Sequence, residues 1–125
     1  MQPLELSAID LLAALRHGDL TAVECAEAFL DRIDATNGSV NAFLCVDREA
    51  ALTRAADIDE RRRSGRPLGP LAGLPVALKD VLCTRDMPTT CASRLLAGYR
   101  PPSDADVVTR LRQADAVFLG KTNMD

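Results

Sequence analysis

Alternating glycines and prolines in residues 63–75, RSGRPLGPLAGLP, constrain the fold more than any other feature of the sequence. Proline lacks an amide hydrogen and glycine weakens both helices and strands, so this run predicts a shaped loop. The loop leads into residues 75–82, whose only charges are Lys79 and Asp80 and which we expect to form a buried central strand. A helix and a second apolar strand, residues 116–119, are predicted further on. This order indicates a parallel strand pair in an α/β sheet with a right-handed crossover.

Two short amphipathic helices are predicted at the start of the chain. Ser7 is a suitable N-cap for the first helix, which ends at a stop signal that includes His17. Thr21 and Glu24 match a capping box for the second helix, whose apolar stripe ends before Asn37. The resulting hairpin packs on the main body or serves a partner protein, and packing is the favoured interpretation.

Three further elements are predicted from local patterns. Residues 40–46 read as a short extended segment, and Asp47 begins an alanine-rich helix that reaches Arg63. A later helix is expected to be capped by Ser103 or Asp104, and a short helical turn precedes it. The last strand ends the sequence with no element after it, so the sheet is expected to be unfinished.

The charge balance excludes some classes of partner. The net charge of −3 and the aromatic share of 3% argue against direct binding of the chain to nucleic acid. A basic cluster at Arg61, Arg62, Arg63 and Arg66 is favoured at a helix C-terminus, so a solvated helix end is preferred over a phosphate or tRNA contact. The sequence shows no membrane-spanning run and no secretory signal, and we expect a cytoplasmic protein.

The cysteines and the single histidine do not suggest a metal site. Cys25, Cys45, Cys83 and Cys91 form no CxxC pair, and His17 is placed at a helix end. We therefore predict no metal ligands and expect reduced, mostly buried thiols.

Lys79 is the candidate catalytic residue. Desolvation lowers the pKa of a buried lysine, and an enzyme can obtain a neutral amine that accepts a proton in this way. Because side chains alternate along a strand, Asp80 is expected to point to the opposite face and is not automatically the partner of Lys79. The alternative is that Lys79 marks the carboxyl end of the strand, where it reaches solvent or pairs with a carboxylate; the residues alone favour this alternative.

Three motifs in the correct order carry a family resemblance. The runs GLPVALKD (73–80), TTCAS (89–93) and GKTNMD (120–125) resemble the opening region of the amidase-signature family, and the similarity spans nearly the whole chain. The lysine motif fits the whole family, whereas TTCAS and KTNMD resemble its tRNA-dependent amidotransferase branch. The chain departs from that branch at Val81, where asparagine is common, and at Asp86, where glycine is common. Both departures concern the loop beside the lysine.

The resemblance implies a fold and a catalytic unit. It implies the N-terminal portion of an α/β/α sandwich with a central mixed sheet, incomplete in this chain. Residues 1–125 would be part of a single amidase domain, with a helical hairpin at 1–36 and the start of the α/β core at 37–125. Lys79 matches the lysine of a triad that contains two serines, both of which lie beyond this sequence. Ser93 is therefore read as a capping or loop-shaping residue without a role in the triad.

The resemblance also implies a function and partners for the intact protein. That protein would hydrolyse glutamine through an acyl-enzyme and deliver ammonia to a B subunit, with a small C subunit completing a heterotrimer. The B subunit would bind ATP with Mg²⁺ and the mischarged tRNA, converting Glu-tRNA(Gln) or Asp-tRNA(Asn), so no cofactor is expected in this chain. The alternatives are a free-standing amidase for small amides and a non-catalytic interaction fragment. Without the serines, the 125-residue chain is expected to be inactive and marginally stable.

Overall fold

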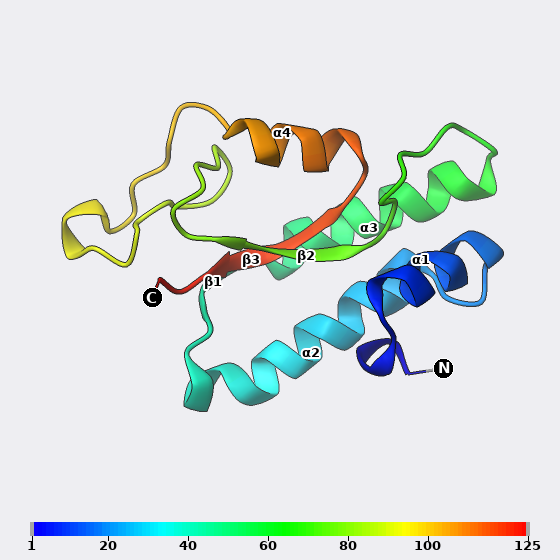
Figure 1. Cartoon of the computed structure of the whole chain (residues 1–125), viewed down its shortest axis with the longest axis horizontal. Coiled ribbons are helices and arrows are strands. Elements are labelled where there is room, and N and C mark those ends of the chain that lie inside the picture. Colours follow the sequence, from blue (N-terminus) through cyan, green and yellow to red (C-terminus); the bar gives the residue numbers. More distant parts are fainter. Residues whose placement is uncertain (1, 125) are drawn as a thin grey trace.

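The computed structural model describes residues 2–124 as a short sheet with helices around it (Figure 1). Met1 and Asp125, the two ends of the predicted domain, lie outside the described residues. Each helix and strand expected from the sequence is present, although several ends differ. In chain order the elements are η1 (Pro3–Glu5), α1 (Ala8–His17), α2 (Ala22–Val40), β1 (Phe43–Val46), α3 (Arg48–Arg63), β2 (Pro75–Lys79), η2 (Arg94–Leu96), α4 (Asp106–Gln113) and β3 (Val117–Thr122).

The three strands form one mixed sheet in the order β1-β3-β2. β2 and β3 are parallel, which confirms the predicted pair, and β1 runs antiparallel along the other edge of β3. The prediction of a central strand over residues 75–82 is wrong, because β2 ends at Lys79 and pairs with β3 alone among the described residues. β3 is the central strand of the described sheet, and it continues to Thr122 instead of stopping at residue 119. The far end of β3 pairs on both sides, with β2 at Lys79 and with β1, which was predicted only as an extended segment.

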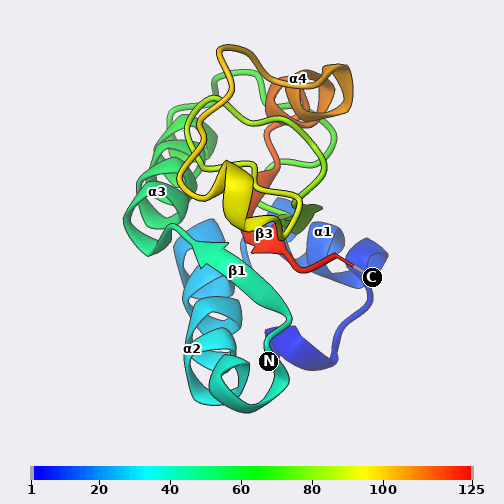
Figure 2. The same cartoon turned by 90° about the vertical axis from the view of Figure 1, so that its left-hand side faces the viewer.

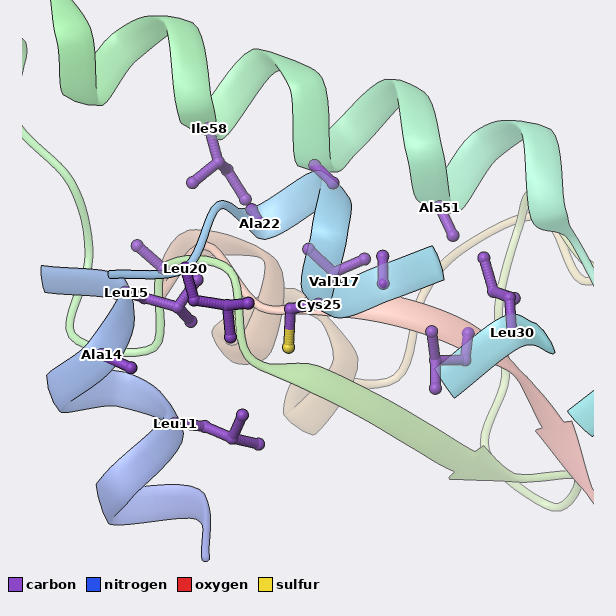
Figure 3. Close-up of a cluster of buried hydrophobic side chains, with 14 residues drawn as sticks. Leu11, Ala14, Leu15, Leu20, Ala22, Cys25, Leu30, Ala51, Ile58 and Val117 are labelled. Atoms are coloured by element: carbon purple, nitrogen blue, oxygen red, sulfur yellow. The ribbon is translucent and has the colours of Figure 1, made fainter. Parts of the chain in front are cut away.

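Helices cover both faces of the sheet, which agrees with the predicted α/β/α layering (Figures 1 and 2). The larger core lies where α1, α2 and α3 pack against β3, and it buries Leu15, Leu30 and Val117 among others (Figure 3). A smaller core on the other face brings Leu78 of β2 against Val108 of α4. Full burial of one such aliphatic side chain contributes about 1.5–3 kcal/mol. The N-terminal hairpin therefore packs on the main body, as the favoured interpretation stated.

The starts of α1, α2 and α3 and the ends of α1 and α3 follow the sequence closely, and the end of α2 does not. The side chains of Ser7 and Thr21 accept a hydrogen bond from the first turn of the helix that follows, as predicted, and Asp47, predicted only to begin its helix, does the same. α2 does not stop before residue 37 but runs on to Val40, after which Asn41 adopts the left-handed conformation that ends it, with φ of 55°.

The predicted cap of the last helix is wrong. α4 has Ala105 at the N-cap and no side-chain hydrogen bond there. Asp104 instead accepts a hydrogen bond from the backbone N–H of Arg85 and pairs with Arg112, so a tertiary contact outcompetes the local cap. Burial works to raise the pKa of Asp104, but these partners outweigh it and hold the pKa below its usual value.

Asp115 ties the glycine- and proline-rich loop to α3 and to the start of β3. Its buried carboxylate pairs with Arg54 at 3.2 Å and Arg61 at 2.6 Å, and it accepts the backbone N–H of Gly69 at 2.7 Å. Burial works to raise the pKa of Asp115, but the hydrogen bonds from Arg61 and Gly69 are stronger and the pKa is lowered. Arg61 is thus a structural contact, and the prediction of a wholly solvated basic helix end is wrong at this position.

The thiols are less buried than predicted. Cys25 is fully buried in the larger core, and burial raises its pKa to about 11. Cys45 and Cys91 are half-buried, and Cys83 is exposed. All four are free cysteines.

Candidate active site

Lys79 is the last residue of β2 and lies opposite Thr122 of β3 in the parallel ladder. Its side chain is half-buried, so the predicted burial holds only in part, and the alternative of a strand-end lysine describes its position. The backbone turns immediately after it, because the N–H of Leu82 donates to the carbonyl oxygen of Lys79 at 2.9 Å. Lys79 therefore stands at the carboxyl end of a parallel strand, where α/β proteins commonly place functional groups.

Asp80 is buried beside the candidate lysine and points away from it. Only 1% of Asp80 is exposed, and its carboxylate accepts hydrogen bonds from both the N–H and the hydroxyl of Thr90. The ion-pair partner of its other oxygen, Oδ1, is Lys121, with Nζ at 3.3 Å. Burial works to raise the pKa of Asp80, but Thr90 and the charge on Lys121 outweigh it and lower the pKa. The prediction that Asp80 need not pair with Lys79 agrees with this arrangement.

Lys121 is the fully buried lysine of the structure, and the sequence reasoning did not single it out. Its side chain is 0% exposed, and its Nζ donates to Thr89 Oγ1 at 2.8 Å and to Thr84 Oγ1 at 3.1 Å. A third hydrogen bond reaches the carbonyl oxygen of Pro88 at 3.2 Å, and Asp80 is the fourth oxygen neighbour. An ammonium group has three donors and no acceptor, so the three hydrogen bonds satisfy it, and the Asp80 carboxylate balances its charge.

A β-bulge in β3 turns Lys121 toward this site. The register passes from Val76 opposite Phe118 to Ala77 opposite Gly120, which leaves Leu119 as an extra residue. Phe118 and Lys121 are three positions apart and would face opposite sides of a regular strand. The extra residue brings Lys121 opposite Leu78, whose side chain belongs to the same small core as Phe118.

Gly120 is required at this bulge. A Cβ atom at residue 120 would lie 2.1 Å from the carbonyl oxygen of Cys45 and 3.0 Å from Cα of Val46. Both atoms belong to the backbone of β1, so neither can move aside without shifting the strand. The glycine therefore permits the close approach of β1 that accompanies the bulge.

The loop after β2 is held by hydrogen bonds and carries unusual backbone angles. Cys91 and Ala92 both have positive φ, 52° and 57°, which is uncommon for residues other than glycine. The N–H of Cys91 donates to the carbonyl oxygen of Asp80 at 3.2 Å. Ser93 caps η2 by accepting a hydrogen bond from the N–H of Leu95, which confirms its predicted capping role.

The two departures from the family pattern have different surroundings. Val81 is 50% exposed. Asp86 pairs with Arg112 at 2.9 Å, and its carbonyl oxygen accepts a hydrogen bond from Arg100 at 2.7 Å. Asp86 thus attaches the loop to α4 through a carboxylate that a glycine could not supply.

An open groove of about 580 Å³ adjoins the same loop. Its walls come from β1 and from the segment that contains Thr90 and η2, and they are mainly apolar. Lys79 is not among its lining residues, whereas Thr90, which binds Asp80, is. The structure therefore brings Lys121, Asp80 and the threonines together, and the alternation of side chains along an extended backbone directs Lys79 to the opposite face.

Other kinds of site receive no support within residues 2–124. In that range no group of three or more His, Cys, Asp or Glu side chains could hold a metal ion. No helix of the described chain is long and apolar enough to cross a membrane.

A signal for Lys121 was present in the sequence. Lys121 follows the apolar run 116–119 and one glycine, much as Lys79 follows the apolar start of β2. Both lysines thus end an apolar strand, and the two strands are adjacent and parallel. Lys121 is buried because of the bulge, and no local sequence pattern predicts that bulge.

Comparisons with known proteins identify the family. The Amidase family matches residues 24–125. The chain is 56% identical over 119 residues to the A subunit of glutamyl-tRNA(Gln) amidotransferase of Salinispora tropica, covering 95% of this chain and 24% of that protein. The protein of the same name from Streptomyces coelicolor is 52% identical over 122 residues, covering 98% and 24%. Native peptide amidase from Stenotrophomonas maltophilia superposes with a TM-score of 0.88 at 41% identity, covering 95% of this chain and 25% of that one.

The chain belongs to the amidase family, as the sequence motifs predicted. Its fold is the α/β arrangement of that family's structures, with a mixed sheet between helices. The chain spans about a quarter of the length of the relatives that it matches.

Proposed function

We propose that the chain is the N-terminal part of the glutamine-hydrolysing subunit of a tRNA-dependent amidotransferase. The observation that carries the proposal is the identity of 52–56% to proteins named as that subunit, over nearly the whole chain. The lysine that matches the family motif stands at the carboxyl end of β2, with the backbone on both sides of it hydrogen bonded.

In this proposal Lys79 is the base of the catalytic unit. A serine hydroxyl is a weak nucleophile until a neighbouring base accepts its proton, and the lysine amine would do so through a bridging serine. The two serines would be supplied by sequence that follows Asp125. The acyl-enzyme formed from glutamine would release ammonia and then be hydrolysed to glutamate.

The proposed assembly contains a B and a C subunit. The ammonia would pass to the B subunit, where ATP and Mg²⁺ activate the carboxylate of Glu-tRNA(Gln) or Asp-tRNA(Asn). Exposed apolar side chains on the described surface, including Leu95 at 96% and Tyr99 at 47%, are consistent with a surface that further protein covers. The acidic net charge of −3 agrees with binding of tRNA elsewhere in the complex.

The second candidate is an amidase that acts on small amides without partner subunits. It is favoured by the close superposition on a peptide amidase at 41% identity. Both candidates use Lys79 in the same role, so the substrate distinguishes them.

A chimera tests the proposal. Residues 1–125 replace the matching quarter of the Salinispora tropica protein, which supplies the remaining sequence and is co-expressed with its own B and C subunits. We expect glutamine hydrolysis by the chimera, no activity toward a peptide amide, and no glutaminase activity from residues 1–125 alone.

Two variants of the chimera test the role of Lys79. Loss of a general base typically lowers turnover by about 10²–10⁴-fold, and we expect a fall of this size for Lys79→Ala. Arg110→Ala, on the exposed surface of α4, is the control and should leave turnover unchanged. Wild-type turnover in Lys79→Ala would refute the role of Lys79 as the base. Preference of the chimera for the peptide amide over glutamine would favour the second candidate.

A further inference from the structure

We propose that Lys121 is a positioning residue that sets the direction of Lys79 by holding the loop that follows β2. The inference rests on the proposed function only in taking Lys79 as the base. The evidence for it is the side chain of Lys121, which is 0% exposed. Its ammonium contacts the loop at Asp80, Thr84, Pro88 and Thr89. The catalytic scheme above gives this cation no role.

The hydroxyl groups around Lys121 are oriented to accept from it. Thr84 Oγ1 donates to the carbonyl oxygen of Met87 at 2.9 Å, and Thr89 Oγ1 donates to that of Leu82 at 3.3 Å. Each hydroxyl therefore donates its single proton to a backbone carbonyl oxygen of the loop. Its oxygen keeps a lone pair that accepts a hydrogen bond from the Lys121 ammonium. Removal of the ammonium would leave these buried lone pairs without their donor and Asp80 Oδ1 without its ion-pair partner, while Asp80 Oδ2 would keep its hydrogen bonds from Thr90.

The same contacts determine where Lys79 points. Lys121 holds the side chain of Asp80, the residue that directly follows β2, on one face, and consecutive side chains of extended backbone point to opposite faces. The N–H of Asp80 donates to the carbonyl oxygen of Thr122 at 3.0 Å, and the N–H of Leu82 donates to that of Lys79. With Asp80 fixed, Lys79 is directed to the other face of β2. If Asp80 were released, the end of the strand could rotate and Lys79 would lose that direction.

Lys121 does not itself serve as a base in this arrangement. Its side chain is completely buried and four oxygens of the described chain surround its Nζ, so a substrate has no access to it. It acts on the chemistry only through Lys79.

The sequence provides a direct test, because it contains two lysines, Lys79 and Lys121. Residues 1–125 are labelled with ¹³C at the lysine Cε, and Lys79→Arg assigns the two side-chain signals. In Lys121→Met we expect the Lys79 signal to move toward its position in urea. We also expect its reaction with a water-soluble amine reagent to accelerate by about threefold or more, as for a segment that opens locally.

Asp115→Asn is the matched control for a general loss of stability. Asp115 is also buried and paired, with Arg61, but it lies at the opposite end of β3 from Lys121. Asparagine tolerates the positive φ of 68° at this position. The Lys79 signal should stay in place in this variant. An equal shift in Asp115→Asn, or an unchanged Lys79 signal in folded Lys121→Met, would overturn the proposal.

A milder variant covers the case in which Lys121→Met does not fold. Thr89→Val removes one of the four oxygens around the ammonium and keeps the shape of the side chain. We expect a smaller shift of the Lys79 signal in the same direction, and no shift would count against the proposal.

The chimera gives a second test of Lys121. Misplacement of a catalytic group by about 1 Å costs on the order of 100-fold in turnover, and we expect a loss of this size for Lys121→Met in the chimera. An active Lys79→Ala chimera refutes the proposed base, whereas the NMR result tests Lys121 independently.

Discussion

The buried pair formed by Asp80 and Lys121 allows a quantitative prediction about stability. The perturbation is a double-mutant cycle that consists of Lys121→Met, Asp80→Asn and the double variant. Lys121→Met leaves the Asp80 carboxylate buried with its Thr90 hydrogen bonds but without the cation at 3.3 Å. Asp80→Asn leaves the ammonium with three neutral oxygens.

The magnitude follows from the distance and the burial of this pair. Two unit charges 3.3 Å apart attract by about 5 kcal/mol at an effective dielectric constant of about 20, and desolvation offsets part of this. Removing one partner of a buried pair costs about 3–5 kcal/mol, since the other charge is left uncompensated. The double variant leaves no such charge, so we expect it to be about 2–3 kcal/mol more stable than the sum of the single effects predicts.

The assay is urea unfolding at pH 7, followed by far-ultraviolet circular dichroism and extrapolated linearly to water. In thermal melts the single variants should lose about 10–20 °C in Tm. A coupling energy below about 0.5 kcal/mol would show that the two charges act independently, which would refute the reasoning.

The remaining predictions concern the bulge and the response to acid. Gly120→Ala forces a Cβ to within 2.1 Å of the β1 backbone and should lower the free energy of unfolding in urea by about 3 kcal/mol. Gly38→Ala is the control, because a Cβ there, in α2, has nothing within 4 Å and should be neutral or stabilising. Equal effects of the two variants would contradict the close approach of β1. The pKa values of Asp80, Asp104 and Asp115 are lowered by folding, so their stabilisation is complete above the unfolded value of 3.8 and is lost as the pH falls through the folded values. Unfolding free energy should therefore decrease below about pH 4 in a pH series of urea melts, and Asp80→Asn should flatten that decrease.

The local signals in the sequence were sufficient for the helix starts. Ser7 and Thr21 cap their helices as predicted, and the helix predicted to begin at Asp47 does begin there, because a cap involves only the next three residues. The failed cap at Asp104 shows the limit of this reasoning, since its carboxylate binds the backbone N–H of Arg85, in another part of the chain, and the side chain of Arg112, near the end of α4.

The position of β2 in the sheet could not be read from its apolar character. An apolar strand is consistent with burial between neighbours, and the residues 75–82 were accordingly predicted as central. In the described sheet β1 pairs with β3 instead, and β3 takes the centre. Pairing between segments some 75 positions apart depends on which strands meet during folding, and no pattern within one strand encodes it.

The sequence by itself determined the family, the helices and the identity of the candidate base, because each of these depends on residue types in a fixed order. Motifs that contain Lys79 and GKTNMD were enough to predict an amidase, and the Amidase family match confirms that prediction. The tertiary structure alone decided which lysine is buried. Lys121 is enclosed because a bulge at Leu119 and the close approach of β1 at Gly120 turn it toward Asp80, and both are contacts between strands that are distant in sequence.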